Sequence, residues 1–129
     1  MNIHNQIPTD QPQDAPNKAL DGFFQKAIAI KQERETLVSV GVPALHRLAK
    51  IASRDTGQAS TVRRFLLGLY NGYRWPFDLT RLRGLDQDLF SDCLDVLTMD
   101  ARATVQEIHY YFESGDAVFA EFAQMEAGQ

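Results

Sequence analysis

Apolar residues recur every three or four positions along most of this chain, which is the spacing of amphipathic helices. The period begins after Asn17, with Leu20, Phe23, Phe24, Ala27 and Ile28. Residues 1–16 lack it and are rich in Pro, Gln, Asn and Asp. Such a segment does not bury enough apolar surface to offset the entropy cost of ordering. We therefore expect a flexible, disordered tail over residues 1–16 and a single all-helical domain over residues 17–129.

Glycine and proline divide the first half of the pattern into helices. The first helix should fade between Glu35 and Val40, before Gly41 and Pro43. Pro43 suits the first turn of a second helix, which ends at residues 55–57 and buries Leu45, Leu48, Ala49 and Ala52. Ser60 can cap a third helix, which runs to Asn71–Gly72 and buries Val62, Phe65, Leu66, Leu69 and Tyr70.

The segment that follows is irregular at first and then helical again. Trp75 precedes a proline and is expected to be extended or in a turn. Asp78 should start a short helical turn that ends near Gly84, and Phe77 and Leu79 should anchor this segment in the core. Asp86 is expected to cap a fourth helix, which buries Leu89, Phe90, Cys93, Leu94 and Leu97.

Two further helices complete the pattern. Asp100 should open a fifth helix that ends at Ser114–Gly115 and buries Val105, Ile108 and Phe112. A last helix should begin at Asp116 and bury Val118, Phe119 and Phe122. Alternating apolar runs are absent apart from residues 37–42, so a sheet is not expected. The predicted fold is all-α, a single compact domain of about five to six short helices.

Composition places the chain among ordinary cytoplasmic domains. Its 129 residues are 44% hydrophobic, and its one cysteine, Cys93, is most simply a buried small hydrophobe in a reducing compartment. Residues 1–16 resemble no secretory signal, and no run approaches the roughly 20 apolar residues of a membrane span.

Charge is distributed unevenly along the chain. The net charge is −4, yet residues 43–84 carry 8 basic and 2 acidic side chains, and residues 85–129 carry 1 and 10. Either these two segments pack together and part of the asymmetry cancels, or the basic segment faces an acidic partner. A phosphate-binding face would use His46, Lys50, Arg54, Arg63 and Arg64.

Known motifs for DNA binding and catalysis find little support. The two helices predicted in residues 43–70 have about the lengths found in a helix-turn-helix motif. The second of them, which would be the recognition helix, contains FLLGLY, whose apolar side chains are expected to be buried. His109 and Glu113 lie one turn apart without further metal ligands, and the acidic stripe Asp88, Asp92 and Asp95 is most simply hydrated. We expect no metal, no cofactor and no enzymatic activity.

The stretch LGLYNGYRWPFDLTRLRGLD, residues 67–86, combines the residue types that dominate binding hot spots. We expect the partner-binding residues to be Tyr70, Tyr73, Arg74, Trp75, Arg81 and Arg83. Exposed arginine beside aromatic rings would also suit a single-stranded nucleic acid. A separate apolar stripe, residues 20–30, leaves a homodimer open.

Five ordered words, FLLGLYNG, PFDL, LRGLD, LFSDCLDVLTMDAR and EIHYYF, resemble an uncharacterised bacterial family, a domain of unknown function met on plasmids and integrative conjugative elements. The resemblance covers about residues 41–112. It implies cargo of mobile DNA in a bacterial cytoplasm and transfers no site residues. With it, the first hypothesis is a non-enzymatic interaction protein that binds a protein partner, such as a host defence or transfer complex. The alternative is a nucleic-acid-binding accessory protein that uses residues 43–84.

Overall fold

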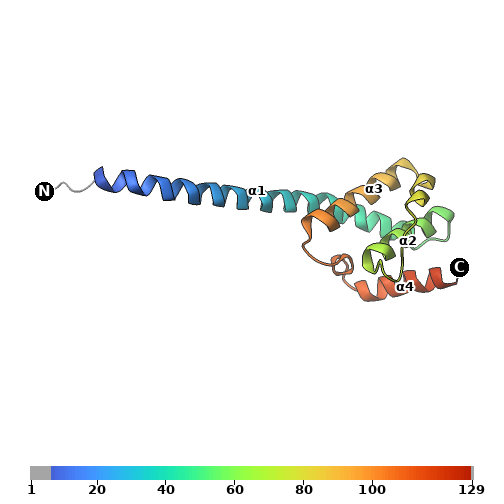
Figure 1. Cartoon of the computed structure of the whole chain (residues 1–129). Coiled ribbons are helices and arrows are strands. Elements are labelled where there is room, and N and C mark those ends of the chain that lie inside the picture. Colours follow the sequence, from blue (N-terminus) through green and yellow to red (C-terminus); the bar gives the residue numbers. More distant parts are fainter. Residues whose placement is uncertain (1–6, 129) are drawn as a thin grey trace. The chain divides into compact units, whose positions relative to one another are not determined.

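The fold is all-α, and over the part of the chain that the structure describes it contains no strand. The structure is a computed structural model that describes residues 7–128, and side chains from residue 17 onward. Figure 1 shows the order of the elements along the chain. These are α1 (Ile7–Ala52), α2 (Gly57–Tyr70), η2 (Leu79–Gly84), α3 (Gln87–Thr98), η3 (Met99–Ala103), η4 (Ile108–Tyr111) and α4 (Gly115–Ala127).

The chain divides into two units, residues 1–33 and residues 34–129. The described part of the first unit is the N-terminal stretch of α1 alone. Residues 1–6 of the expected tail lie outside the described residues, and disorder there stays a prediction. The backbone of residues 7–16 is helical, so the helix begins earlier than the apolar pattern indicates.

The expected break at Gly41 and Pro43 is wrong, because α1 continues through both residues. Proline removes one backbone donor from a helix interior, which opposes continuity. Burial outweighs that cost here, since Gly41 and Ala44 lie fully inside the second unit. A Cβ atom on Gly41 would lie 2.5 Å from the Sδ atom of Met99 and 2.6 Å from its Cβ atom. Gly41 is therefore a point of close helix packing rather than a helix end.

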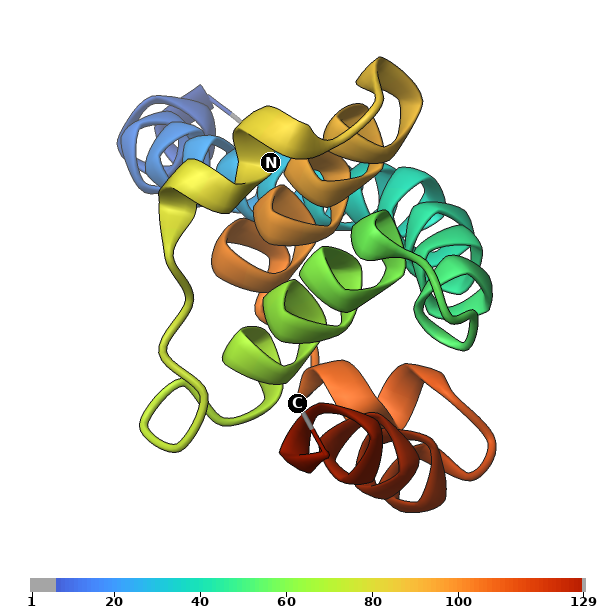
Figure 2. The same cartoon turned by 90° about the vertical axis from the view of Figure 1, so that its right-hand side faces the viewer.

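Helix α2 is the centre of the second unit (Figure 2), with α3 on one side and α4 on the other. Its buried side chains include Val62, Leu66 and Leu67, each with no exposed surface. They join the buried face of α1 and residues from α3, η3 and α4 in one core, which includes Leu45, Leu48, Cys93, Val96, Met99, Phe119 and Phe122. This core confirms most of the predicted helical stripes.

Thr56, not Ser60, caps α2. The Oγ1 atom of Thr56 accepts a hydrogen bond of 3.1 Å from the backbone N–H of Ala59. The helix consequently begins three residues before the predicted cap. Ser60 is left inside the first turn, where its hydroxyl is directed to a side chain of α4.

The short turn predicted after Asp78 is present as η2. The Oδ1 atom of Asp78 accepts hydrogen bonds from the backbone N–H and the hydroxyl of Thr80, at 2.9 and 2.7 Å. Phe77 is half-buried against the core, as predicted. Leu79 is 71% exposed, so its predicted role as a core anchor is wrong.

The predicted fifth helix is replaced by two short elements. A π-helical turn, η3, ends at Ala103. The next residue, Thr104, is left-handed with a φ of 48°, and the 3₁₀ turn η4 follows after an irregular stretch. Met99, Ala103 and Ile108 are buried, whereas Val105 is 56% exposed, contrary to the pattern. Gly115 begins α4 instead of ending the fifth helix.

We predict that Gly41→Ala lowers the stability of the compact unit, although alanine is ordinarily the better helix residue. The added methyl group would overlap the Met99 side chain, and such overpacking costs about 1–3 kcal/mol. Thermal and urea unfolding, followed by circular dichroism, measure the change.

Gly22→Ala in the same helix is the matched control, because nothing lies within 4 Å of its Cβ position. This variant should gain helix propensity and lose no stability. A Gly41→Ala protein as stable as the wild type would contradict the close packing described above.

Candidate functional site

The loop after α2 is held against the end of that helix by Asn71. The Asn71 N–H donates to the Leu67 carbonyl at 2.8 Å, and its own carbonyl accepts from the Trp75 N–H at 2.9 Å. Its side-chain Oδ1 also accepts from the Arg74 N–H at 3.1 Å. The approach is close, because a Cβ atom on Gly68 would lie 3.2 Å from the Trp75 carbonyl oxygen. These contacts hold the loop in one position against the end of α2.

This loop, α2, η2 and α3 enclose an apolar pocket with a volume of about 210 Å³. Twelve residues form its lining, and none is charged: Phe65, Gly68, Leu69, Gly72, Trp75, Pro76, Phe77, Leu79, Leu82, Cys93, Leu94 and Leu97. We call this feature the Trp75 pocket. Within this lining, Phe65 and Phe77 meet edge to face, with ring centroids 5.7 Å apart.

Apolar side chains remain exposed around the Trp75 pocket. Leu79 is the most exposed of them, and Leu94 and Leu97 are 44% and 40% exposed. Tyr73 in the adjoining loop is fully solvent-accessible. Clustered apolar side chains that stay in water around a concave apolar site are typical of binding surfaces.

Cys93 lies at the base of the Trp75 pocket and is buried, as predicted. Burial raises the pKa of its thiol to about 12, and the neighbouring charge of Asp92 adds to this. The thiol is therefore protonated at neutral pH, whereas a nucleophilic cysteine needs a lowered pKa.

The predicted partner-binding residues separate into different environments. Tyr73, Arg74 and Trp75 lie together in the loop, with the guanidinium carbons of Arg64 and Arg74 5.0 and 5.5 Å from the centre of the Trp75 ring. Trp75 is half-buried in the pocket wall.

Of the six predicted partner-binding residues, Trp75 belongs to the pocket lining, and the other five, Tyr73 and Arg74 included, lie outside it. Tyr70 packs against His109 and Phe119, with ring centroids 5.0 and 4.8 Å away. Arg81 donates a hydrogen bond to the Ser60 hydroxyl, and Arg83 is exposed on η2.

The predicted phosphate-binding set is likewise divided. Lys50 and Arg54 are exposed. The Nε2 atom of His46 lies 3.2 Å from the Tyr111 carbonyl, to which it can donate. Arg63 is only 1% exposed and cannot reach a phosphate, so its assignment to that face is wrong. Sequence periodicity does not predict the burial of Arg63, because α2 is surrounded by other elements on several sides. A position on the polar side of the helix pattern is therefore buried as well.

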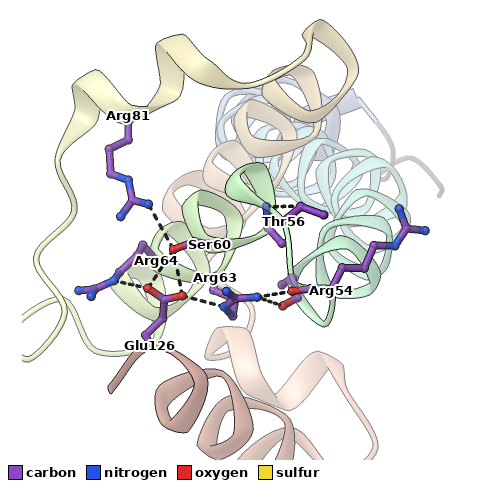
Figure 3. Close-up of polar contacts among 9 residues, drawn as sticks. Arg54, Thr56, Ser60, Arg63, Arg64, Arg81 and Glu126 are labelled. Atoms are coloured by element: carbon purple, nitrogen blue, oxygen red, sulfur yellow. Dashed lines mark hydrogen bonds and ion pairs between the residues drawn. The ribbon is translucent and has the colours of Figure 1, made fainter. Parts of the chain in front are cut away.

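A buried ion-pair cluster holds Arg63 in place (Figure 3). The Nε atom of Arg63 donates to the Glu126 carboxylate at 2.7 Å, and its Nη1 atom donates to the carbonyls of Ala52 and Arg54 at 2.8 and 2.6 Å. Arg64 and Ser60 donate to the same carboxylate, at 2.6 Å and at 3.0–3.1 Å. The cluster joins the end of α1 and one face of α2 to the last turn of α4.

The pKa of Glu126 reflects this cluster. Burial raises the pKa of this carboxyl, but the hydrogen bonds from Arg63, Arg64 and Ser60, together with the Arg63 charge, outweigh burial and hold it below its ordinary value. Glu126 could have been found in the sequence, because it follows Phe119 by seven residues and Phe122 by four. An acid on the apolar face of a helix requires a partner.

Internal pairing thus accounts for part of the charge asymmetry. Arg47 also makes a bidentate contact with Asp92 of α3, with distances of 3.0 and 2.9 Å. Three basic side chains of residues 43–84 therefore pair with acids of the C-terminal third. The predicted acidic stripe on α3 is correspondingly interrupted, since Asp92 is buried.

Within the described residues, no three His, Cys, Asp or Glu side chains converge as metal ligands would. His109 and Glu113 do not form a pair; the nearest acid to His109 is Asp116, with Nε2 and Oδ1 3.6 Å apart. No helix in the described part of the chain combines the length and apolar character that a bilayer crossing needs.

We predict that Glu126→Gln destabilises the protein at neutral pH by roughly 3 kcal/mol, because the buried Arg63 loses its counter-charge. A carboxyl with a lowered pKa stabilises the fold above its unfolded-state value, and this contribution is lost as pH falls through the folded-state value. Wild-type melting temperature should therefore fall steeply below about pH 4.5, and the variant should show a flatter decline.

Glu121→Gln on the exposed side of α4 is the control and should follow the wild-type pH profile. Differential scanning calorimetry from neutral to acid pH makes the comparison. Identical acid profiles for wild type and Glu126→Gln would refute the stabilising role of this carboxylate.

Comparison with known proteins identifies the compact unit. A family of unknown function, DUF7673, matches residues 42–127. This range lies within the second unit and includes α4, which the five sequence words do not reach. No curated protein and no solved structure matches the chain. Since the match spans about two thirds of the sequence, the chain belongs to this family.

Proposed function

We propose that the compact unit is a non-enzymatic protein-binding module that receives an apolar side chain of a protein partner in the Trp75 pocket. The observation that carries this proposal is the pocket together with its exposed rim of Leu79, Leu94 and Leu97. Burial of these side chains against a partner would remove apolar surface from water, which is the main driving force of association.

The size and lining of the pocket favour a protein side chain over a small substrate. Its volume of about 210 Å³ is below the roughly 300–1,000 Å³ of usual small-molecule sites. Small-molecule sites also carry a few polar groups that orient the ligand, and this lining consists of apolar residues and glycine. The raised pKa of the Cys93 thiol argues against this cysteine as an activated nucleophile in the pocket.

The residues beside the pocket suit a protein partner as well. Tyr73 and Arg74 are exposed next to the half-buried Trp75. Tyrosine and arginine at the edge of an apolar pocket provide large contact area and directional hydrogen bonds, as in interface hot spots. The loop is also rigidly held by Asn71, so little entropy would be lost on binding.

Nucleic acid remains the second candidate because Lys50, Arg54 and Arg83 are exposed. Against it, Arg47, Arg63 and Arg64 are already paired with internal carboxylates. A phosphate would have to compete with those carboxylates, which weakens the basic face. The mobile-element setting that the resemblance implies leads us to propose a host defence or transfer complex as the source of the protein partner.

Selection of peptides from a random library against the immobilised full chain tests this function. We expect selected peptides to share an aromatic or leucine anchor. Their affinity should fall at least about tenfold for Leu79→Asp and Leu94→Asp, because a charge would enter an apolar interface. Val105→Asp is the control: this residue is 56% exposed, like the rim residues, and lies outside the pocket.

Titration of labelled single- and double-stranded DNA and RNA distinguishes the second candidate. Binding that weakens steeply between about 50 and 200 mM salt would favour a nucleic acid. Peptides that bind all four proteins equally, or a failure to select any peptide, would contradict the proposed pocket.

A further inference from the structure

The first unit presents an apolar helix face that no described residue of that unit covers. Within α1, five large apolar residues are between 52% and 66% exposed: Leu20, Phe23, Phe24, Ile28 and Ile30. Their spacings of three, four and seven residues place them on one side of the helix. The adjacent rings of Phe23 and Phe24 meet edge to face, with centroids 5.7 Å apart.

A helix of this kind needs a covering surface. Helices without tertiary contacts are marginally stable in water, and most helical stability in proteins comes from packing of the apolar face. Five large apolar side chains along about three turns form a continuous stripe, unlike the scattered apolar residues of ordinary surfaces. A continuous exposed stripe of this kind is typical of an interaction surface.

We propose that this stripe pairs with the same stripe of a second copy of the chain, in antiparallel orientation. This inference is independent of the proposed function, since it concerns residues 17–33 and not the Trp75 pocket. The family match begins at residue 42, so the dimerising segment would be an addition to the family domain.

The charges of the segment favour a second copy as the covering partner. Residues 17–33 carry three basic and two acidic side chains, namely Lys18, Lys26, Lys31, Asp21 and Glu33. This near balance allows two copies to approach without strong repulsion. Anionic membranes and nucleic acids instead select dense clusters of basic residues.

The position of Lys31 selects the antiparallel orientation. Lys31 follows Phe24 by seven residues and Ala27 by four, so it lies within the apolar face. Parallel pairing in register would place Lys31 against Lys31 of the second copy, and like charges that face each other are destabilising. Antiparallel pairing centred on Lys26 brings Lys31 level with Asp21 of the second copy, an opposite charge beside Leu20.

Sedimentation velocity of the full chain over a concentration series tests the pairing. We expect a dimer that dissociates on dilution. Ile28→Asp should raise the dimer dissociation constant at least about tenfold, whereas Val105→Asp, at similar exposure, should leave it unchanged. A wild-type chain that stays monomeric up to about 100 µM, whether or not it binds vesicles of phosphatidylcholine and phosphatidylserine, would overturn the proposal.

A charge swap tests the orientation. Asp21→Lys and Lys31→Asp should each weaken the dimer about threefold or more, because each places like charges opposite each other in the antiparallel pair. The double variant Asp21→Lys with Lys31→Asp should recover wild-type affinity. Single variants that dimerise as well as the wild type, or a double variant no better than the singles, would overturn the antiparallel arrangement.

Discussion

The compact unit depends on the buried contact between Arg63 and Glu126. Both side chains are 1% exposed, and the Nε atom of the arginine lies 2.7 Å from the carboxylate. Charges removed from water are tolerated only when their hydrogen-bonding groups are satisfied. Here the guanidinium also donates to the carbonyl of Ala52, the last residue of α1, and to that of Arg54 just after it. A single side chain of α2 therefore links the end of α1 to the last turn of α4.

This constraint reaches the Trp75 pocket through α2. Arg64, the next residue, donates to Glu126 and lies against the Trp75 ring, and Arg81 of η2 donates to Ser60 within the same cluster. The polar cluster and the apolar pocket are thus connected through Arg64 and Arg81. The pocket is preformed because its walls are held by these contacts, and preformed sites lose less entropy on binding.

The hydrophobic period predicted the all-α fold and most buried positions, because burial follows the helical repeat directly. Breaks between elements were harder to predict. Gly41 and Pro43 are local helix breakers, yet packing of α1 against Met99 keeps the helix intact. The candidate site was predicted in part: the region around Tyr73 and Trp75 was found from residue type. The burial of Arg63 was not predicted. It depends on a tertiary contact with Glu126, which lies 63 residues away in the sequence.

Trp75 is the one tryptophan of the chain and forms part of the pocket wall, so its fluorescence reports pocket occupancy directly. In the proposed function, the compact unit binds protein through this pocket. The decisive test is to titrate the full chain with a selected peptide or protein partner while Trp75 emission is recorded. The ligand must itself lack tryptophan, so that the signal comes from Trp75 alone. We expect a saturable shift in emission that Leu79→Asp weakens. A partner that binds tightly and leaves Trp75 emission unchanged would contradict it.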